Sequence, residues 1–293
     1  MSEKPLVSIL LLSMNHELFI QQCIESLKDQ TYKNIEVVYL DNASSDATFN
    51  LGKKLLEESG LQYKIFYNKE SQSISKNLNF LLANSSGKYI SPLSTDDWFA
   101  PQNIEKKVSF FLNNPGTGSV FSNGWFYYQN DHTCLLNDSS TFKRGHLYRE
   151  VLNNPDCVFY VGMMYSREVF EKVGGWDERL MIEDTDMYVR ISMVADINYI
   201  NEPLTYYRRT SASVSKNKKF MLEGYYQYYE KYKTAKWINM KRWLAERHRL
   251  FATDCIDNKK NKEATAFLFK AIKINPLSLK HFRTMFYLIR QSL

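Results

Sequence analysis

Glycine, proline and cysteine are all scarce in this sequence. Its 293 residues include 11 glycines, 7 prolines and 4 cysteines, while 44% of residues are hydrophobic. Such a composition excludes collagen-like repeats and low-complexity disorder, which need far more glycine and proline or far fewer apolar residues. The chain can therefore bury a substantial core, in one large domain with a smaller appendage.

Disulfide scaffolds, zinc sites and membrane spans are also disfavoured. The four cysteines are scattered along the chain without CxxC spacing, which argues against both a disulfide scaffold and a zinc site. The longest early apolar run, 6–12, is too short for a signal-peptide core, and no window approaches the roughly 20 apolar residues of a membrane span. We therefore expect a cytoplasmic protein, either free or held peripherally at the inner face of the cell membrane.

Charge is distributed unevenly behind a mild net value of +6. Residues 1–215 contain 20 Lys and Arg against 26 Asp and Glu, whereas residues 216–293 contain 18 against 6. The first region is thus acidic by 6 charges and the second basic by 12. This asymmetry predicts a domain over 1–215 and a basic, aromatic-rich helical region over 216–293.

Two common nucleotide-binding motifs are missing. No GxGxxG follows the first apolar run, and no GxxxxGK[ST] occurs anywhere, which argues against a Rossmann dinucleotide site and a P-loop. Instead, β-branched runs alternate with segments of helical periodicity in units of about 30 residues, which predicts βαβ crossovers and a mostly parallel sheet. The expected strands are Val7–Leu12, Ile35–Leu40, Tyr63–Tyr67 and Lys88–Leu93, and the expected helices are Glu17–Gln30, Asp46–Ser59 and Ser71–Asn84.

Two acidic pairs are candidates for chemistry. Asp96 and Asp97 follow a predicted strand, where two adjacent carboxylates repel unless a cation lies near them. Mg²⁺ or Mn²⁺ shared with a diphosphate would supply that charge, and an N-cap before Pro101 is the alternative. Glu183 and Asp184 open a predicted helix, where a cap or a general base is possible. For the second pair taken alone, the cap is favoured.

The order of several short motifs resembles that of the inverting glycosyltransferases of family 2. The resemblance covers roughly residues 6–215, and its blocks are individually weak but jointly specific. They are 7–15, 23–27 and 36–46 in the opening; 75–77, 83–90 and 93–98 in the second block; and 173–178, 183–186 and 207–210 in the third.

This resemblance implies a GT-A fold, which is a Rossmann-like, mostly parallel sheet flanked by helices, here followed by the helical C-terminal region. It also implies a nucleotide-diphosphate sugar donor and a divalent cofactor, Mg²⁺ or Mn²⁺. On this view Asp97 would hold the metal, Asp96 would face the ribose or donor sugar, and Asp184 would be the catalytic base supported by Glu183, which is itself a second candidate base. The implied nucleotide-binding residues are Leu12, Ser13, Asn15, Asp41, Asn42 and Lys76.

Three positions depart from the family pattern. Ser94 stands where many members have a further Asp, and Thr210 stands where they often have a His near the metal, so metal dependence is less strict an expectation. Asn42 replaces a common Asp, which leaves thymine open beside uracil because an amide both accepts and donates hydrogen bonds. Trp176, in a turn before the second acidic pair, is the best candidate to stack on the acceptor sugar, with a core position as the alternative.

The implied activity is sugar transfer from a UDP-sugar, or a dTDP-sugar, to a hydroxyl of a glycan, lipid-linked or protein acceptor in surface polysaccharide or glycoconjugate assembly. A non-catalytic nucleotide-sugar or carbohydrate-binding module is the alternative. For residues 216–293 we expect an anionic membrane surface, self-association or packing within the chain. Nucleic acid is not expected as a partner, because no motif for it accompanies the basic residues.

Overall fold

The computed structural model describes residues 4–210, 213, 216–236 and 238–292. The chain forms two compact units. One contains Met1–Glu178 and Glu183–Ser211, and the other contains Ala212–Leu293 together with the short segment Arg179–Ile182. We call them the sheet unit and the helical unit. The boundary predicted at residue 215 lies outside the described residues.

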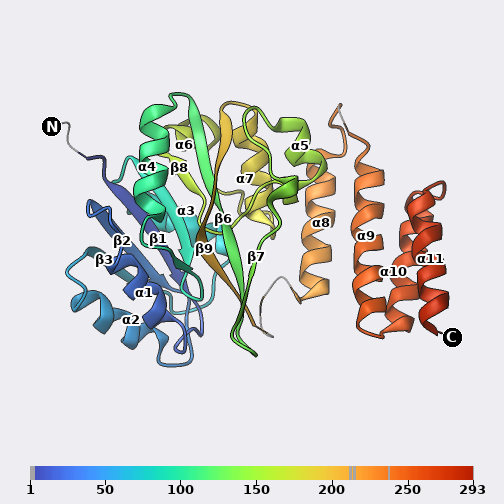
Figure 1. Cartoon of the computed structure of the whole chain (residues 1–293), viewed down its shortest axis with the longest axis horizontal. Helices are drawn as coiled ribbons and strands as arrows, with labels where there is room; N and C mark the ends of the chain where they lie inside the picture. Colours follow the sequence, from blue (N-terminus) through green and yellow to red (C-terminus); the bar gives the residue numbers. More distant parts are fainter. Residues whose placement is uncertain (1–3, 211–212, 214–215, 237, 293) are drawn as a thin grey trace. The chain divides into compact units, whose positions relative to one another are not determined.

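Four parallel strands form the first half of the sheet, in the order β3-β2-β1-β4 (Figure 1). Their bounds are β1 Val7–Ser13, β2 Ile35–Asp41, β3 Gln62–Tyr67 and β4 Tyr89–Ser94. All four confirm the expected strands. In the register of this sheet Ser13 lies opposite Asp41 and Leu12 lies opposite Ser94, so the polar ends of three strands meet at one edge.

Helices pack on this half of the sheet because their apolar residues recur at helical spacing. A single core cluster joins Val7, Ile9 and Leu11 of β1 to the inner sides of α1, α2 and α4. Helix α3 contacts β1 and β2 as well, and Leu78 and Leu81 on it are buried outside that cluster. The bounds are α1 Ile20–Lys28, α2 Thr48–Glu57, α3 Ile74–Ala83 and α4 Asn103–Asn113.

The second half of the sheet continues from β4 in the order β8-β6-β9-β5, with β7 paired to β6. Strand β8 is antiparallel to both β4 and β6, whereas β6 and β9 are parallel. The strands are β5 Trp98–Phe99, β6 Thr117–Tyr128, β7 Thr133–Leu136, β8 Met164–Ser166 and β9 Asp196–Arg209. The remaining helices of the sheet unit are α5 Tyr148–Asn153, α6 Arg167–Val173 and α7 Glu183–Ser192, with short 3₁₀ turns at Ser139–Thr141 and Pro155–Cys157.

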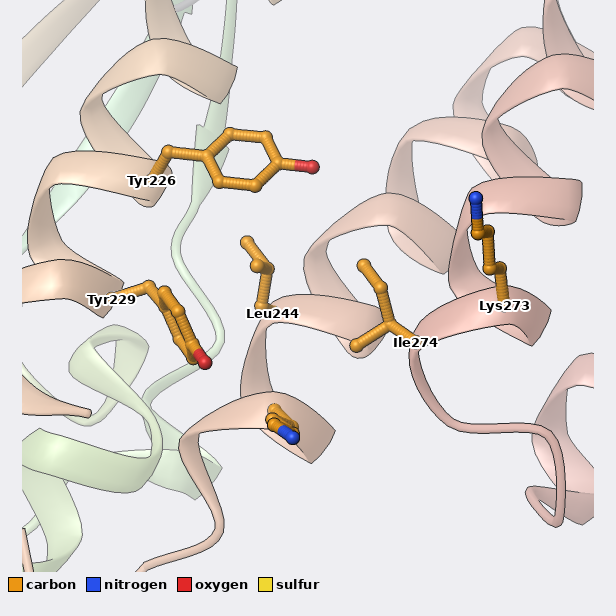
Figure 2. A pocket seen from close by; sticks show the side chains of 6 residues that line it. Tyr226, Tyr229, Leu244, Lys273 and Ile274 are labelled. Carbon is orange, nitrogen blue, oxygen red and sulfur yellow. The ribbon is translucent and has the colours of Figure 1, made fainter. Parts of the chain in front are cut away.

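The helices of the helical unit are α8 Lys218–Tyr232, α9 Met240–Asp257, α10 Asn261–Ile274 and α11 Leu279–Ser292, in agreement with the helical character expected for this region. Aromatic side chains hold α8 to α9, with the rings of Tyr228 and Tyr225 4.9 and 5.6 Å from that of Trp243. A shallow pocket of about 280 Å³ lies between α8, α9 and α10. Figure 2 shows the tyrosines of α8 that line it, Tyr226 and Tyr229. No helix among the described residues is long and apolar enough to cross a membrane.

Candidate active site

The loops after β1 and β2 are tied together by a buried carboxylate. Asp41 is fully buried and accepts hydrogen bonds from the Ser13 hydroxyl at 2.8 Å and from the backbone and side chain of Ser44 at 2.8 and 2.6 Å. In return, the Ser44 hydroxyl accepts a bond from the backbone amide of Asn15, whose side chain accepts one from the Ser45 amide. Three of the predicted nucleotide-binding residues, Ser13, Asn15 and Asp41, therefore belong to one network.

Asn42 anchors a second loop beside this network. Its amide oxygen accepts from the backbone of Gln72 at 2.8 Å and from Asn68, and its amide nitrogen donates to the Gln72 carbonyl at 3.0 Å. The side chain of Gln72 then accepts a 2.9 Å bond from the ammonium of Lys76, in the first turn of α3. Asn42 and Lys76 are thus linked through Gln72. Leu12, the penultimate residue of β1, is half-buried.

The acidic pair after β4 carries charge that the described residues compensate only in part. Asp97 is buried, and burial together with the neighbouring Asp96 charge raises the pKa of its carboxyl well above the usual range. Asp96 presents a buried Oδ1 with no hydrogen-bond partner in the described part of the chain; the Nδ1 atom of His16 lies 3.9 Å from it. That ring nitrogen is closer to the Thr95 hydroxyl, at 2.9 Å.

Arg208, near the end of β9, supplies the nearest fixed positive charge. Its backbone amide donates a 2.8 Å bond to Oδ1 of Asp97, and its Nε donates a 2.8 Å bond to the Asp96 carbonyl. The terminal nitrogens donate to the side chains of Gln22 and Gln129. The guanidinium also lies 4.7–5.0 Å from three ring centroids, which belong to Phe19, Trp98 and Tyr127. Arg208 is therefore held rigidly behind the acidic pair.

The second acidic pair begins α7. Glu183 is buried and Asp184 keeps partial access to solvent. Burial raises the pKa of both carboxyls, and the charge of Asp184 raises that of Glu183 further. Two tyrosines, Tyr165 of β8 and Tyr188 of α7, are buried nearby. Burial raises the pKa of both hydroxyls, and the charge of Asp184 raises it further. A carboxyl that holds its proton toward neutral pH in this way is suited to proton transfer with a substrate.

Tyr160 lies between the two acidic pairs. Its carbonyl is 3.5 Å from the donating hydroxyl of Tyr188, the tyrosine beside Asp184. Burial raises the pKa of its own hydroxyl, with smaller contributions from Tyr207 and from the charge of Asp97. Tyr160 is therefore hydrogen-bonded to a tyrosine beside the second pair and is influenced electrostatically by the first.

The acceptor-side prediction for Trp176 is wrong. Only 2% of its surface is exposed, and its ring packs at 5.0 Å from Phe170 and edge-on at 6.1 Å from Tyr165. Its backbone is fixed by paired hydrogen bonds with the side chain of Asn79. With its ring covered by the core, Trp176 takes the alternative role stated for it, a packing residue.

The residues at β4 fit a divalent cation that shares its ligands with a substrate. Within the described ranges, no three His, Cys, Asp or Glu side chains come together as a metal-binding group. Asp96 and Asp97 nevertheless provide hard oxygen ligands, one of them an unpartnered buried oxygen. Mg²⁺ and Mn²⁺ need only one or two protein carboxylates when phosphate oxygens complete the coordination. Thr210, at the expected position of a third ligand, is half-buried and offers no imidazole.

Sequence reasoning missed several residues of this site. A lone histidine without ligand spacing gives no signal in the sequence, yet the ring of His16 lies beside Thr95 and Asp96. Tyr160, Tyr165 and Tyr188 were not singled out either. Of His16, the three tyrosines and Arg208, only Arg208 falls within a motif, the segment 207–210 of the third block.

Comparison with known proteins identifies the class. Residues 8–174, more than half of the chain, match the model for glycosyl transferase family 2. The chain therefore belongs to that family, which confirms the resemblance drawn from the order of its motifs.

Curated relatives carry related names. The chain is 30% identical over 205 residues to an uncharacterized glycosyltransferase of Rickettsia bellii, covering 67% of this chain and 28% of the relative. It is 24% identical over 227 residues to the glycosyltransferase GlyA of Streptococcus pneumoniae (72% and 31%), and 33% identical over 110 residues to the putative glycosyltransferase EpsE of Bacillus subtilis (38% and 40%). The matched segments thus span 28–40% of the lengths of these relatives.

Solved structures show the same fold. TarS 1–349 of S. aureus in complex with UDP-GlcNAc has a TM-score of 0.67 at 15% identity, covering 98% of this chain and 89% of that one. The mannosyltransferase PcManGT from Pyrobaculum calidifontis, in complex with GDP-Man and Mn²⁺, has a TM-score of 0.67 at 16% identity, with coverages of 99% and 87%. The expected GT-A fold is confirmed.

Proposed function

We propose that this protein is an inverting glycosyltransferase that moves a sugar from a nucleotide-diphosphate donor to an acceptor hydroxyl. One observation carries the proposal: the Asp96–Asp97 pair after β4 and the Glu183–Asp184 pair at the start of α7, whose pKa is raised, belong to one unit of a GT-A fold. The similar structures bind UDP-GlcNAc and GDP-Man. We favour a UDP-sugar, with dTDP- and GDP-sugars as the alternatives to test.

Donor binding would use the loops after β1 and β2. The network around Asp41 fixes the backbone at Asn15 and Ser44, and the network around Asn42 fixes Gln72 and Lys76. Lys76 is exposed, so its ammonium is available to the nucleotide. Asp96 would orient the ribose or donor sugar, and Asp97 would hold Mg²⁺ or Mn²⁺, which when bound offsets the negative charge that grows on the departing diphosphate.

The chemical step is a single in-line displacement. Asp184 would take the proton from the acceptor hydroxyl as that oxygen forms its bond to the anomeric carbon. The bond from that carbon to the diphosphate oxygen breaks on the opposite side, and its electron pair leaves with the nucleotide diphosphate. Glu183 beside it would keep the shared charge of the pair low until the acceptor arrives, because two adjacent buried carboxylates do not both ionise readily.

The test is a transfer and hydrolysis assay with a panel of UDP-, dTDP- and GDP-sugars, with Mn²⁺ or Mg²⁺. We expect turnover with one donor class and an inverted anomeric configuration in the product. Asp184→Asn should bind that donor and transfer it at least 100-fold more slowly. Glu171→Gln, an exposed carboxylate on α6, is the matched control and should behave as the original protein. Donor binding without any turnover would support a non-catalytic binding module instead.

We also propose that the helical unit docks on an anionic lipid surface through α11, which would suit a lipid-linked acceptor. Four apolar residues spaced three and four apart form a stripe along this helix and are 46–75% exposed. They are Leu279, Phe282, Phe286 and Ile289. The opposite side of the helix, at His281 and Thr284, is buried.

Charge selects a lipid surface as the occupant of this stripe. Helix α11 contains Lys280, Arg283 and Arg290 and no acidic residue, and the whole of 216–293 is basic by 12 charges. An apolar stripe beside cationic side chains is the pattern of helices that lie in the plane of an anionic bilayer surface.

Sedimentation with lipid vesicles tests this docking. We expect the protein to bind vesicles rich in phosphatidylglycerol and not vesicles of phosphatidylcholine, and the double change Phe282→Ser with Phe286→Ser to abolish binding. Leu250→Ser, which removes another exposed apolar side chain, on α9, should not change it. Equal binding of the double variant would overturn the proposal. Dimerisation through the same residues without any binding to vesicles would also overturn it.

A further inference from the structure

The segment Arg179–Ile182 lies in the sequence directly before the candidate base, yet it belongs to the helical unit. Its structural partners are on α8. The backbone amide of Met181 donates a 2.9 Å hydrogen bond to Oε1 of Gln227, and both flanking stretches, up to Glu178 and from Glu183, belong to the sheet unit. Four consecutive residues directly before α7 therefore belong to the helical unit, although the residues on either side of them do not.

A glycine in the middle of α8 allows this contact. A Cβ atom on Gly224 would lie 2.8 Å from Cγ2 and 3.5 Å from the backbone nitrogen of Ile182, so the helix backbone rests against that residue. Glycine within a helix is unfavourable by up to about 1 kcal/mol relative to alanine. Gly224 and Gln227 are three residues apart and so lie on the same side of α8. Together they fix the side chain of Ile182 and the backbone of Met181.

Chain continuity carries this restraint into the candidate active site. Glu183 is bonded to Ile182, and consecutive Cα atoms are about 3.8 Å apart, so a shift of Ile182 must displace the first turn of α7. Glu183 and Asp184 are in that turn, beside Tyr165 of β8 and Tyr188 of α7. A displacement of about 1 Å in a catalytic group can slow a reaction by roughly 100-fold.

The geometry points to Gln227 and Gly224 as positioning residues that hold Asp184 where it can take the acceptor proton. This inference rests on the proposed function. It assigns the helical unit a part in the chemical step that is separate from docking.

Substitutions at Gln227 test the inference most directly. Gln227→Met keeps the length of the side chain and removes the acceptor for the Met181 amide, whereas Gln227→Glu keeps an acceptor oxygen at the same reach. We expect Gln227→Met to lower kcat roughly 10-fold with the donor KM unchanged, and Gln227→Glu to restore most of kcat. Gly224→Ala should act like Gln227→Met, because its new methyl group must push Ile182 away.

Tyr229→Phe is the matched control. Tyr229 is on the same helix and lines the pocket in Figure 2, so the change removes a polar atom from α8 without touching Met181. We expect kcat and KM of the original protein. Equal kcat in Gln227→Met and Tyr229→Phe would overturn the inference, and so would a loss in Gln227→Met that Gln227→Glu does not restore.

A second readout separates this inference from the proposed function. Carboxyl NMR with labelled Glu and Asp follows the titration of the Glu183–Asp184 pair without any substrate. In Gln227→Met, a less firmly held Arg179–Ile182 segment should admit water to the carboxyl pair and lower the midpoint pH of its titration. In Tyr229→Phe the midpoint should not change. If the original protein transfers no sugar, the proposed function fails, and an unmoved midpoint in Gln227→Met then overturns the positioning role as well.

Discussion

The backbone amide of Arg208 donates a 2.8 Å hydrogen bond to Oδ1 of Asp97, residues that are 111 positions apart in the sequence. This bond fastens the end of β9 to the loop after β4. Because the donor is the backbone amide of residue 208, shortening the Arg208 side chain leaves the bond in place. An asparagine at position 97 would also offer an Oδ1 atom to accept it. The charge of Asp97 can therefore be removed without breaking the contact.

Asp97→Asn should make the protein more stable while weakening its use of metal. The Asp97 charge is unfavourable in the folded state, since burial and Asp96 raise its pKa. Removing it should raise the metal-free unfolding free energy by about 1–2 kcal/mol in urea titrations. Calorimetry with Mn²⁺ and a nucleotide diphosphate should show at least a tenfold loss of affinity. A less stable variant with unchanged metal affinity would contradict the assignment.

In a plot of the transfer rate against pH, the rise on the acidic side, the acidic limb, should lie closer to neutral pH than it does for an ordinary carboxylate base. The pKa of Asp184 and Glu183 is raised, so the pair keeps its proton above the ordinary carboxyl range and the rate should rise as the pair loses it. Glu183→Gln removes a like charge and should shift the limb of kcat to lower pH. A limb that stays in place in Glu183→Gln would show that another group governs the rate.

Asn42→Asp should weaken nucleotide binding rather than improve it. The amide nitrogen of Asn42 donates to the Gln72 carbonyl, and a carboxylate oxygen would face that carbonyl instead. We expect a loss of about 1–3 kcal/mol in the stability of the loop, detected as faster proteolysis near residue 72, and a matching loss of nucleotide affinity. Asn34→Asp is the control, since Asn34 also donates to a carbonyl, that of Lys4, but precedes β2, whereas Asn42 follows it at the other end of the strand. Tighter binding of uridine nucleotides by Asn42→Asp would instead assign position 42 to the base.

Glu36 should link stability to low pH. Burial raises the pKa of this carboxyl, but hydrogen bonds from the Ser8 hydroxyl and from Ser86 outweigh it and lower the pKa overall. Its contribution is complete above the unfolded pKa near 4.3 and is lost as the pH falls through the lower folded value. Glu36→Gln should reduce stability by about 1–3 kcal/mol at pH 7 and by less at pH 3. Glu58→Gln, which changes an exposed carboxylate just after α2, should leave the stability unchanged at both pH values.

The sheet could be predicted where strands alternate with periodic helices, as from Val7 to Leu93. It could not be predicted at β5, which has two residues, or at β7, whose four residues are all exposed and leave no pattern of burial. Both strands depend on partners, β9 and β6, that form elsewhere in the chain.

The acidic pairs could be predicted because their order along the chain is informative. The hydrogen bonds from Arg208 to Gln22 and Gln129 could not be predicted. The two glutamines are far from Arg208 in the sequence, and no local pattern indicates that these segments come together. The error at Trp176 has a similar origin. A turn indicates exposure on average, but Phe170 and Tyr165 cover this particular ring.

The passage of Arg179–Ile182 through the helical unit limits how the protein can be divided or recombined. A chain shortened before Lys218 would keep every strand of the sheet, yet the four residues that lead into α7 would lose Gly224 and Gln227. An exchange of helical regions between relatives would have to bring a matching segment at 179–182 with it. The two units are therefore expected to change together in evolution rather than as independent modules.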